Sequence, residues 1–146
     1  PQYHSCFRSC NAGSKQNIWC GKCAKCLFVC CILSPFISEE KLIEIFGKNM
    51  FSDMSLKADF DGLTGITPLK PFECVGTADE VVFALNMTIE KYEKEGKKLP
   101  ELLEYFKSSG KSVQMNLLKE FNPENNVPSV FAADVMEMYK YVSSRN

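Results

Sequence analysis

Three cysteines recur at a spacing of three residues in the stretch Cys20-Gly21-Lys22-Cys23-Ala24-Lys25-Cys26. A fourth cysteine, Cys6, lies fourteen residues before the first of them, in His4-Ser5-Cys6. Four thiolates can close a tetrahedral shell around one zinc ion, and short C-x-x-C loops turn successive sulfurs toward a common point. Glycine at position 21 relieves the backbone where such a loop bends. The sequence therefore predicts a zinc knuckle at the start of the fold.

The spacing of the cysteines leaves the fourth ligand open, because Cys10 and His4 compete with Cys6 for that position. Four available thiolates favour a closed, structural site, since catalytic zinc usually keeps three protein ligands and an open water position. Lys22 and Lys25 would offset part of the negative charge of a zinc tetrathiolate. We expect a structural zinc ion held by the three knuckle cysteines and one ligand from the N-terminal segment.

The distribution of cysteines favours metal over disulfides. Seven of the eight cysteines lie between Cys6 and Cys31, and only Cys74 lies outside that part of the chain. A disulfide scaffold would spread its cysteines along the chain, and it suits a smaller secreted protein. The adjacent Cys30 and Cys31 lie in an apolar run, as expected for buried free thiols. We therefore expect a reducing, cytoplasmic location.

Length and composition are those of an ordinary globular protein. The 146 residues suffice for one hydrophobic core, and 45% of them are hydrophobic and 24% charged. A net charge of −1 gives no electrostatic reason for binding nucleic acid, and the longest apolar run, Cys26 to Leu33, is too short to cross a bilayer. The chain begins at Pro1 and runs directly into the metal motif, so we expect a C-terminal fragment of a longer protein.

Helical periodicity and end signals predict an all-α fold with about six or seven short helices after the knuckle. The pattern places the knuckle and the first buried helix in residues 1–34, and the other helices in residues 35–146 of the same domain. The expected helices are 24–33, ended by Pro35; Ser38 to Phe46, stopped by Gly47; a short helix capped by Ser52 or Ser55 and ending near Gly62; Thr77 to Gly96, with a Thr77–Glu80 capping box; Pro100 to Gly110; 113–121; and a last helix from Pro128 that carries Phe131, Val135, Met138 and Val142. The Met and aromatic residues of the C-terminal helices are expected to be buried in the core.

A long irregular segment, residues 63–76, contains Lys70-Pro71-Phe72-Glu73-Cys74-Val75-Gly76-Thr77 and leads into a helix N-terminus. Free amides at that position, with Gly76 allowing close approach, could accept a phosphate or a carboxylate. Lys70 adds a cation, and Glu73 and Cys74 are possible proton-transfer groups. The alternative is a structured connection to a capped helix, in which Phe72 and Cys74 are simply buried.

Several separated motifs together resemble the C-terminal region of the UDP-N-acetylmuramoyl-L-alanyl-L-glutamate epimerases. They span about residues 4 to 80 and are His4-Ser5-Cys6, Trp19 to Cys26, Phe28-Val29, Leu33-Ser34-Pro35-Phe36, Glu44-Ile45-Phe46-Gly47 and residues 70–77. The cysteine spacing is also similar to the zinc-binding tail of the cyano-deazaguanine synthases, which belong to the ATP pyrophosphatase superfamily. The four cysteines of that tail are placed like Cys6, Cys20, Cys23 and Cys26, and this similarity favours Cys6 over Cys10.

The resemblance implies a function for a longer parent protein. Members of the family use ATP and magnesium to adenylate the terminal glutamate α-carboxylate of a nucleotide-sugar peptide. They then invert that glutamate from L to D for peptidoglycan synthesis and release AMP and pyrophosphate. An upstream nucleotide-binding domain of the same protein would hold ATP through a Ser-Gly-Gly-x-Asp-Ser loop, which this sequence lacks. The fragment alone is therefore expected to be inactive.

Within the fragment, the resemblance makes Lys70, Glu73, Gly76 and Thr77 the predicted substrate contacts, with Glu73 as the candidate catalytic residue. Two other functions fit the same motifs. One is the zinc tail of another ATP-pyrophosphatase-type enzyme, and the other is a non-enzymatic zinc module that binds a protein partner.

Overall fold

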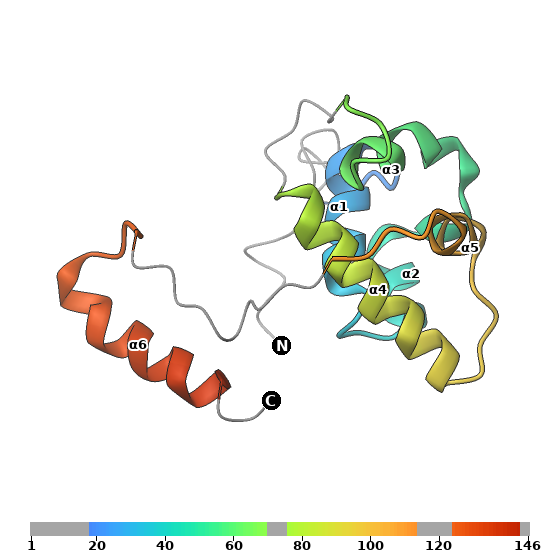
Figure 1. The fold of residues 1–146 in the computed structure, drawn as a ribbon. Helices are drawn as coiled ribbons and strands as arrows, with labels where there is room; N and C mark the ends of the chain where they lie inside the picture. The colour runs from blue at the N-terminus through green and yellow to red at the C-terminus, as the bar shows by residue number, and fades with distance from the viewer. Residues whose placement is uncertain (1–17, 70–75, 114–123, 144–146) are drawn as a thin grey trace. The chain divides into compact units, whose positions relative to one another are not determined.

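The computed structural model describes residues 18–69, 76–113 and 124–143 (Figure 1). The chain divides into two compact units, Pro1–Val113 and Gln114–Asn146. All regular secondary structure in the described ranges is helical, as the sequence predicts. The elements are α1 (Ala24–Leu33), α2 (Glu39–Phe46), the 3₁₀ turns η3 (Met50–Ser52) and η4 (Met54–Leu56), α3 (Lys57–Leu63), α4 (Ala78–Lys94), α5 (Glu101–Ser108) and α6 (Ser129–Ser143).

Helix α1 is the centre of the first unit, and it packs against α2, α3 and α4. Its sequence is apolar on nearly every side, as expected of a helix surrounded by others. Cys30 and Cys31 are buried free thiols, which confirms their interpretation from the sequence. Burial raises the pKa of Cys30 to about 12 and also raises the pKa of Cys31, so both stay neutral core residues.

A lysine from α4 closes the C-terminal end of α1. The Nζ atom of Lys91 donates hydrogen bonds to the carbonyl oxygens of Ser34, at 3.1 Å, and Ile37, at 2.6 Å. These carbonyls follow the last turn of α1, where no further helix supplies N–H donors. The Ser34 hydroxyl also lies 2.6 Å from the Thr88 hydroxyl, so buried polar groups join α1 to α4 at this end.

Helix α2 begins and ends as its sequence predicts. The Ser38 side chain accepts a hydrogen bond from the Lys41 amide, and Gly47 ends the helix with a φ of 76°. The prediction for the following segment was wrong in its caps. The side chains of Asn49 and Asp53, not of Ser52 or Ser55, cap two 3₁₀ turns that precede α3. Asn and Asp carry an acceptor of the right length to reach an amide two residues on, and Ser55 instead donates to Asp53.

Helices α4 and α5 also follow their end signals closely. The Thr77–Glu80 capping box is present at the start of α4. The helix ends at Lys94, just before Gly96, whose φ is 64°. Pro100 was predicted to be the first helical residue of α5, but it lies one position earlier, as the N-cap. The observed start of α5 therefore differs from the predicted start by a single residue.

The second unit contains α6, which follows Pro128 as predicted. Its apolar residues were expected to be buried, but Phe131 and Met138 are 55% and 69% exposed. The helix predicted at 113–121 lies almost wholly outside the described residues. Among the helices that the structure does describe, none combines the length and the apolar character needed to cross a bilayer.

We expect the replacement Lys91→Met to lower the free energy of unfolding by about 1–2 kcal/mol, because two carbonyl oxygens at the end of α1 lose a charged donor. The control is Lys94→Met, since the Lys94 side chain is 78% exposed and its partner Glu90 is 3.7 Å away. That change should cost less than about 0.5 kcal/mol. Urea unfolding of both variants measures the difference, and equal effects would contradict the role given to Lys91.

Candidate metal centre

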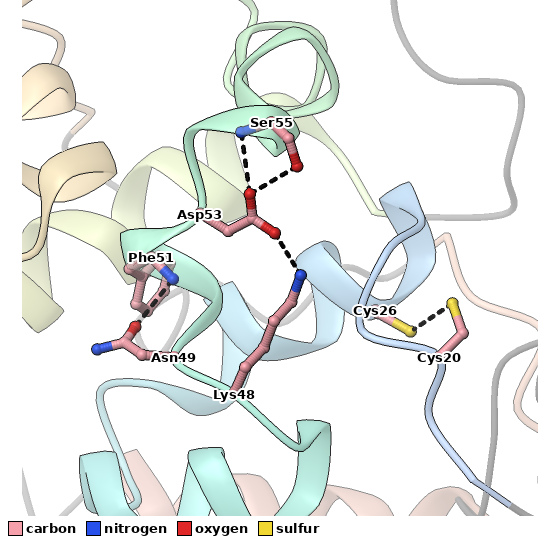
Figure 2. A network of polar contacts seen from close by, with 7 residues as sticks. All are labelled: Cys20, Cys26, Lys48, Asn49, Phe51, Asp53 and Ser55. Atoms are coloured by element: carbon pink, nitrogen blue, oxygen red, sulfur yellow. Dashed lines mark hydrogen bonds and ion pairs between the residues drawn. The ribbon is translucent and has the colours of Figure 1, made fainter.

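The sulfur atoms of Cys20, Cys23 and Cys26 converge at the N-terminal end of α1. All three lie within 4.8 Å of one another. The Sγ atoms of Cys20 and Cys26 are 3.6 Å apart (Figure 2). Those of Cys23 and Cys26 are also 3.6 Å apart. A disulfide would need about 2.0 Å. Tetrahedral zinc with Zn–S bonds of about 2.3 Å sets sulfurs about 3.8 Å apart, so the cluster has the spacing of three ligands on one ion.

The start of α1 explains this convergence. Cys23 is the N-cap residue with an extended backbone, and its carbonyl accepts the first helical hydrogen bond, from the Leu27 amide at 3.1 Å. Its side chain makes no capping hydrogen bond to the backbone. Cys26 lies in the first turn and is fully buried. Cys23 and Cys26 thus both belong to the N-terminal end of α1, and this places their sulfurs together.

Three thiols this close together can be deprotonated at the same time only if a cation lies between them. Burial is the largest cause that raises the pKa of Cys23, and the neighbouring Cys20 thiol raises it further. Thiolates this close repel one another unless a positive charge lies between them, and a bound divalent metal deprotonates its thiols outright. Soft thiolate ligands in a tetrahedral arrangement suit zinc. The residues present therefore fit the predicted ion.

Gly21 seats the knuckle on the C-terminal end of α2. Its φ is 63°, and a Cβ atom at this position would lie 2.8 Å from the carbonyl oxygen of Phe46. The Trp19 ring meets the Phe46 ring edge-on, with centroids 5.5 Å apart. Only glycine satisfies both the backbone angle and the close approach.

The other predicted site residues divide into two groups. The competing fourth ligands Cys6, Cys10 and His4 lie outside the described residues, and so do Lys70 and Glu73. Gly76 and Thr77 are described, and they lead into α4. The choice of the fourth metal ligand and the substrate role of residues 70–77 remain predictions.

The N-terminus of α4 is already capped by the carboxylate of Glu80, a residue of the first turn of the same helix. The Thr77 amide donates to the Glu80 carboxylate at 2.6 Å, and the Glu80 amide donates to the Thr77 hydroxyl at 3.2 Å. A Cβ atom on Gly76 would lie 3.1 Å from the Phe28 ring and would also collide with the Glu80 carboxylate. An external anion at this helix end would therefore compete with Glu80 for donors.

The sequence alone did not predict that Phe46 and Lys48 lie against Gly21. No spacing rule identifies such contacts, because they join parts of the chain about 25 residues apart. The only local signal was the glycine inside the knuckle, which indicates a positive φ or a close approach without naming the neighbour.

The family model for the MurL C-terminal domain matches residues 2–117, which include the whole cysteine cluster. The chain belongs to this family. The match extends well beyond the region of about residues 4 to 80 in which the sequence motifs were found. It ends close to the boundary between the two compact units, at Val113.

Three curated relatives carry the name UDP-N-acetyl-alpha-D-muramoyl-L-alanyl-L-glutamate epimerase. The protein from Micromonospora sp. is 36% identical over 94 residues, which cover 62% of this chain and 21% of the relative. Those from Salinispora tropica and Xanthomonas oryzae pv. oryzae are 37% and 36% identical, covering 61% and 63% of this chain and 20% and 22% of the relatives. The chain thus spans about a fifth of their length. No solved structure matches it.

We expect Gly21→Ala to destabilise the first unit more than Gly96→Ala does. Both glycines have a φ near 64°, but the space around Gly96 is open within 4 Å. The alanine at 96 should therefore cost only the backbone strain, about 1–2 kcal/mol. The alanine at 21 should cost roughly 1–3 kcal/mol more from its clash with the Phe46 carbonyl.

Chemical unfolding and zinc titration of both variants test whether the contact of Gly21 with Phe46 fixes the knuckle. Only Gly21→Ala should also weaken zinc binding, because it displaces the loop between Cys20 and Cys23. If the two variants lose the same stability and bind zinc alike, the contact with Phe46 does not fix the knuckle.

Proposed function

We propose that this chain is the zinc-binding C-terminal region of an ATP-dependent, AMP-forming epimerase. The parent enzyme would convert the terminal L-glutamate of UDP-MurNAc-L-Ala-L-Glu to D-glutamate, in the cytoplasm, for peptidoglycan precursor synthesis. The observation that carries the proposal is the family match over residues 2–117. The names of the three curated relatives support the reaction, and their length supports an upstream domain in the same protein.

The proposed role of zinc is structural. Cys20, Cys23 and Cys26 would supply three thiolates, and Cys6 would close the shell as the fourth. Two observations support this role: the sulfur separations suit a tetrahedral ion, and the cluster joins an irregular segment to the central helix of the core. A closed shell of four thiolates leaves no position for a reactive water.

The chemistry proposed for the parent needs activation of a carboxylate. Attack of the glutamate α-carboxylate on the α-phosphate of ATP would form an acyl adenylate and release pyrophosphate. The mixed anhydride has lost the carboxylate charge and withdraws electrons, so the α-proton becomes acidic. Removing that proton and returning one to the opposite face inverts the centre. Water then cleaves the anhydride, which releases AMP and restores the carboxylate.

In this proposal the upstream domain binds ATP and magnesium, and residues 70–77 contribute to the substrate site. Lys70 would pair with a phosphate or with the activated carboxyl group, and Glu73 is the candidate for proton transfer. Gly76 and Thr77 would bring the backbone close to the substrate. Because the nucleotide site belongs to the upstream domain, the 146-residue chain alone should form no AMP.

For the parent enzyme we expect AMP formation that depends on UDP-MurNAc-L-Ala-L-Glu, together with deuterium uptake at the glutamate α-carbon in heavy water. Glu73→Gln and Lys70→Ala should each lower turnover by a factor of about 10² or more, the usual range for lost acid–base or charge contacts. The matched control is Glu90→Gln, an exposed position on α4. Full turnover in the Glu73 and Lys70 variants would exclude residues 70–77 from the substrate site.

For the metal centre we expect one zinc ion in each reduced chain. Cys23→Ser should abolish zinc binding and lower stability by several kcal/mol, because structural zinc contributes folding free energy directly. Cys30→Ser, the core control, should keep its zinc and cost about 1–3 kcal/mol for a buried hydroxyl without a partner.

Metal analysis and thermal unfolding with and without a chelator separate these outcomes. The chelator should destabilise the unaltered chain and the Cys30 variant, but not the Cys23 variant. Equal chelator sensitivity in all three would sink the zinc assignment.

A further inference from the structure

Lys48 lies across the outer loop of the knuckle. A Cβ atom on Gly21 would be 3.4 Å from Lys48 Cε and 4.0 Å from its Cγ, so the aliphatic stem covers the loop between Cys20 and Cys23. Lys48 directly follows Gly47, whose positive φ ends α2. The same turn therefore presents both the Phe46 carbonyl and the Lys48 side chain to Gly21.

Asp53 holds the end of this lysine in place. Its Oδ2 atom forms a close ion pair with Lys48 Nζ, and the two side chains are only 34% and 27% exposed. Its Oδ1 atom accepts hydrogen bonds from the Ser55 amide at 3.0 Å and the Ser55 hydroxyl at 2.6 Å. Asp53 is thus fixed to the backbone of η4 before it pairs with Lys48. Its hydrogen bonds from Lys48 and Ser55 hold its pKa at about 2, so it stays ionised.

The position of the pair suits a negatively charged metal cluster. Lys48 Nζ is one bond beyond the Cε atom that lies against Gly21, so its positive charge is near the loop between Cys20 and Cys23, and Figure 2 shows this ammonium paired with the Asp53 carboxylate. A zinc ion with four thiolates carries a net charge of about −2, which nearby cations stabilise. Lys22 and Lys25 belong to the knuckle itself, whereas Lys48 comes from outside it, and Asp53 restricts its position.

We propose that Lys48, locked by Asp53, is a positioning residue for the metal centre. Its stem holds the Cys20–Cys23 loop against the end of α2, and its ammonium places a positive charge beside that loop, at a position fixed by Asp53. This inference rests on the proposed zinc site and extends it to residues that are not ligands. Such outer groups typically change metal affinity 10- to 100-fold.

Two variants distinguish between two explanations: that Asp53 holds Lys48 in place, or that only the net charge near the metal site matters. Lys48→Met keeps most of the stem but removes the ammonium. Asp53→Asn keeps an acceptor for the η4 cap, because asparagine is an equally good cap residue, but it removes the ion pair. If only net charge mattered, losing the Asp53 carboxylate would tighten zinc binding. If Asp53 acts by locking Lys48, its loss weakens zinc binding.

The experiment measures zinc affinity by competition with a chelator, in the reduced 146-residue chain. We expect Lys48→Met and Asp53→Asn each to weaken zinc binding about tenfold or more. The double variant should be no weaker than the worse single one, because the two residues act as a unit. Lys48→Arg should restore most of the affinity. Lys41→Met is the matched control, since Lys41 pairs with Glu44 at 2.7 Å but is exposed on α2, and it should bind zinc like the unaltered chain.

Cobalt substitution adds a readout that general destabilisation would not move. At saturating cobalt, the visible absorption band of the bound tetrahedral ion should shift in Lys48→Met and stay unchanged in Lys41→Met. An affinity within twofold of the unaltered chain for Lys48→Met, or tighter binding by Asp53→Asn, would overturn the inference and leave the zinc site intact. An unaltered chain that binds no zinc would instead overturn the proposed metal centre, and this inference with it.

Discussion

Cys26 belongs both to the candidate metal site and to the hydrophobic core, and the packing of the first unit depends on this residue. Its sulfur lies 3.6 Å from two other thiols of the candidate metal site, and its side chain is fully buried in the hydrophobic core. One turn further along α1, Cys30 and Cys31 are surrounded by the other helices. The thiol cluster and the core are therefore joined by a single turn of helix. A change in the position of this turn is transmitted to both, because packed cores adjust poorly to displaced side chains.

The knuckle rests on a part of the fold that has little regular structure of its own. Residues 47–56 contain only two 3₁₀ turns, and the side chains of Asn49 and Asp53 cap them. Asn49 also donates to the Glu39 carboxylate at the start of α2, at 2.6 Å. Polar side chains thus fix this segment to α2. The fixed segment and the end of α2 together present the surface on which Gly21 and Trp19 lie.

Local signals in the sequence sufficed for most helices and for the convergence of three cysteines. The Ser38 and Thr77 caps, the apolar run of α1 and the C-x-x-C spacing each act over a few residues. The structure confirms the two caps, the buried helix and the meeting of the three sulfurs. The cap at 49–55 was mispredicted because four competent side chains, Asn49, Ser52, Asp53 and Ser55, crowd one short segment. The contacts of Gly21 with Phe46 and Lys48 could not be predicted from the sequence, because packing between distant segments leaves no pattern in either segment.

Burial distinguishes the core thiols Cys30 and Cys31 from the half-buried thiols Cys20 and Cys23 of the knuckle. Alkylating or oxidising reagents attack thiolates that they can reach, and the two core thiols are neutral and at most 1% exposed. They become reactive only when the helices around α1 separate. Under native conditions, the rate at which Cys30 and Cys31 are labelled would therefore measure how often the whole core opens. The half-buried Cys20 and Cys23 would report events at the knuckle alone.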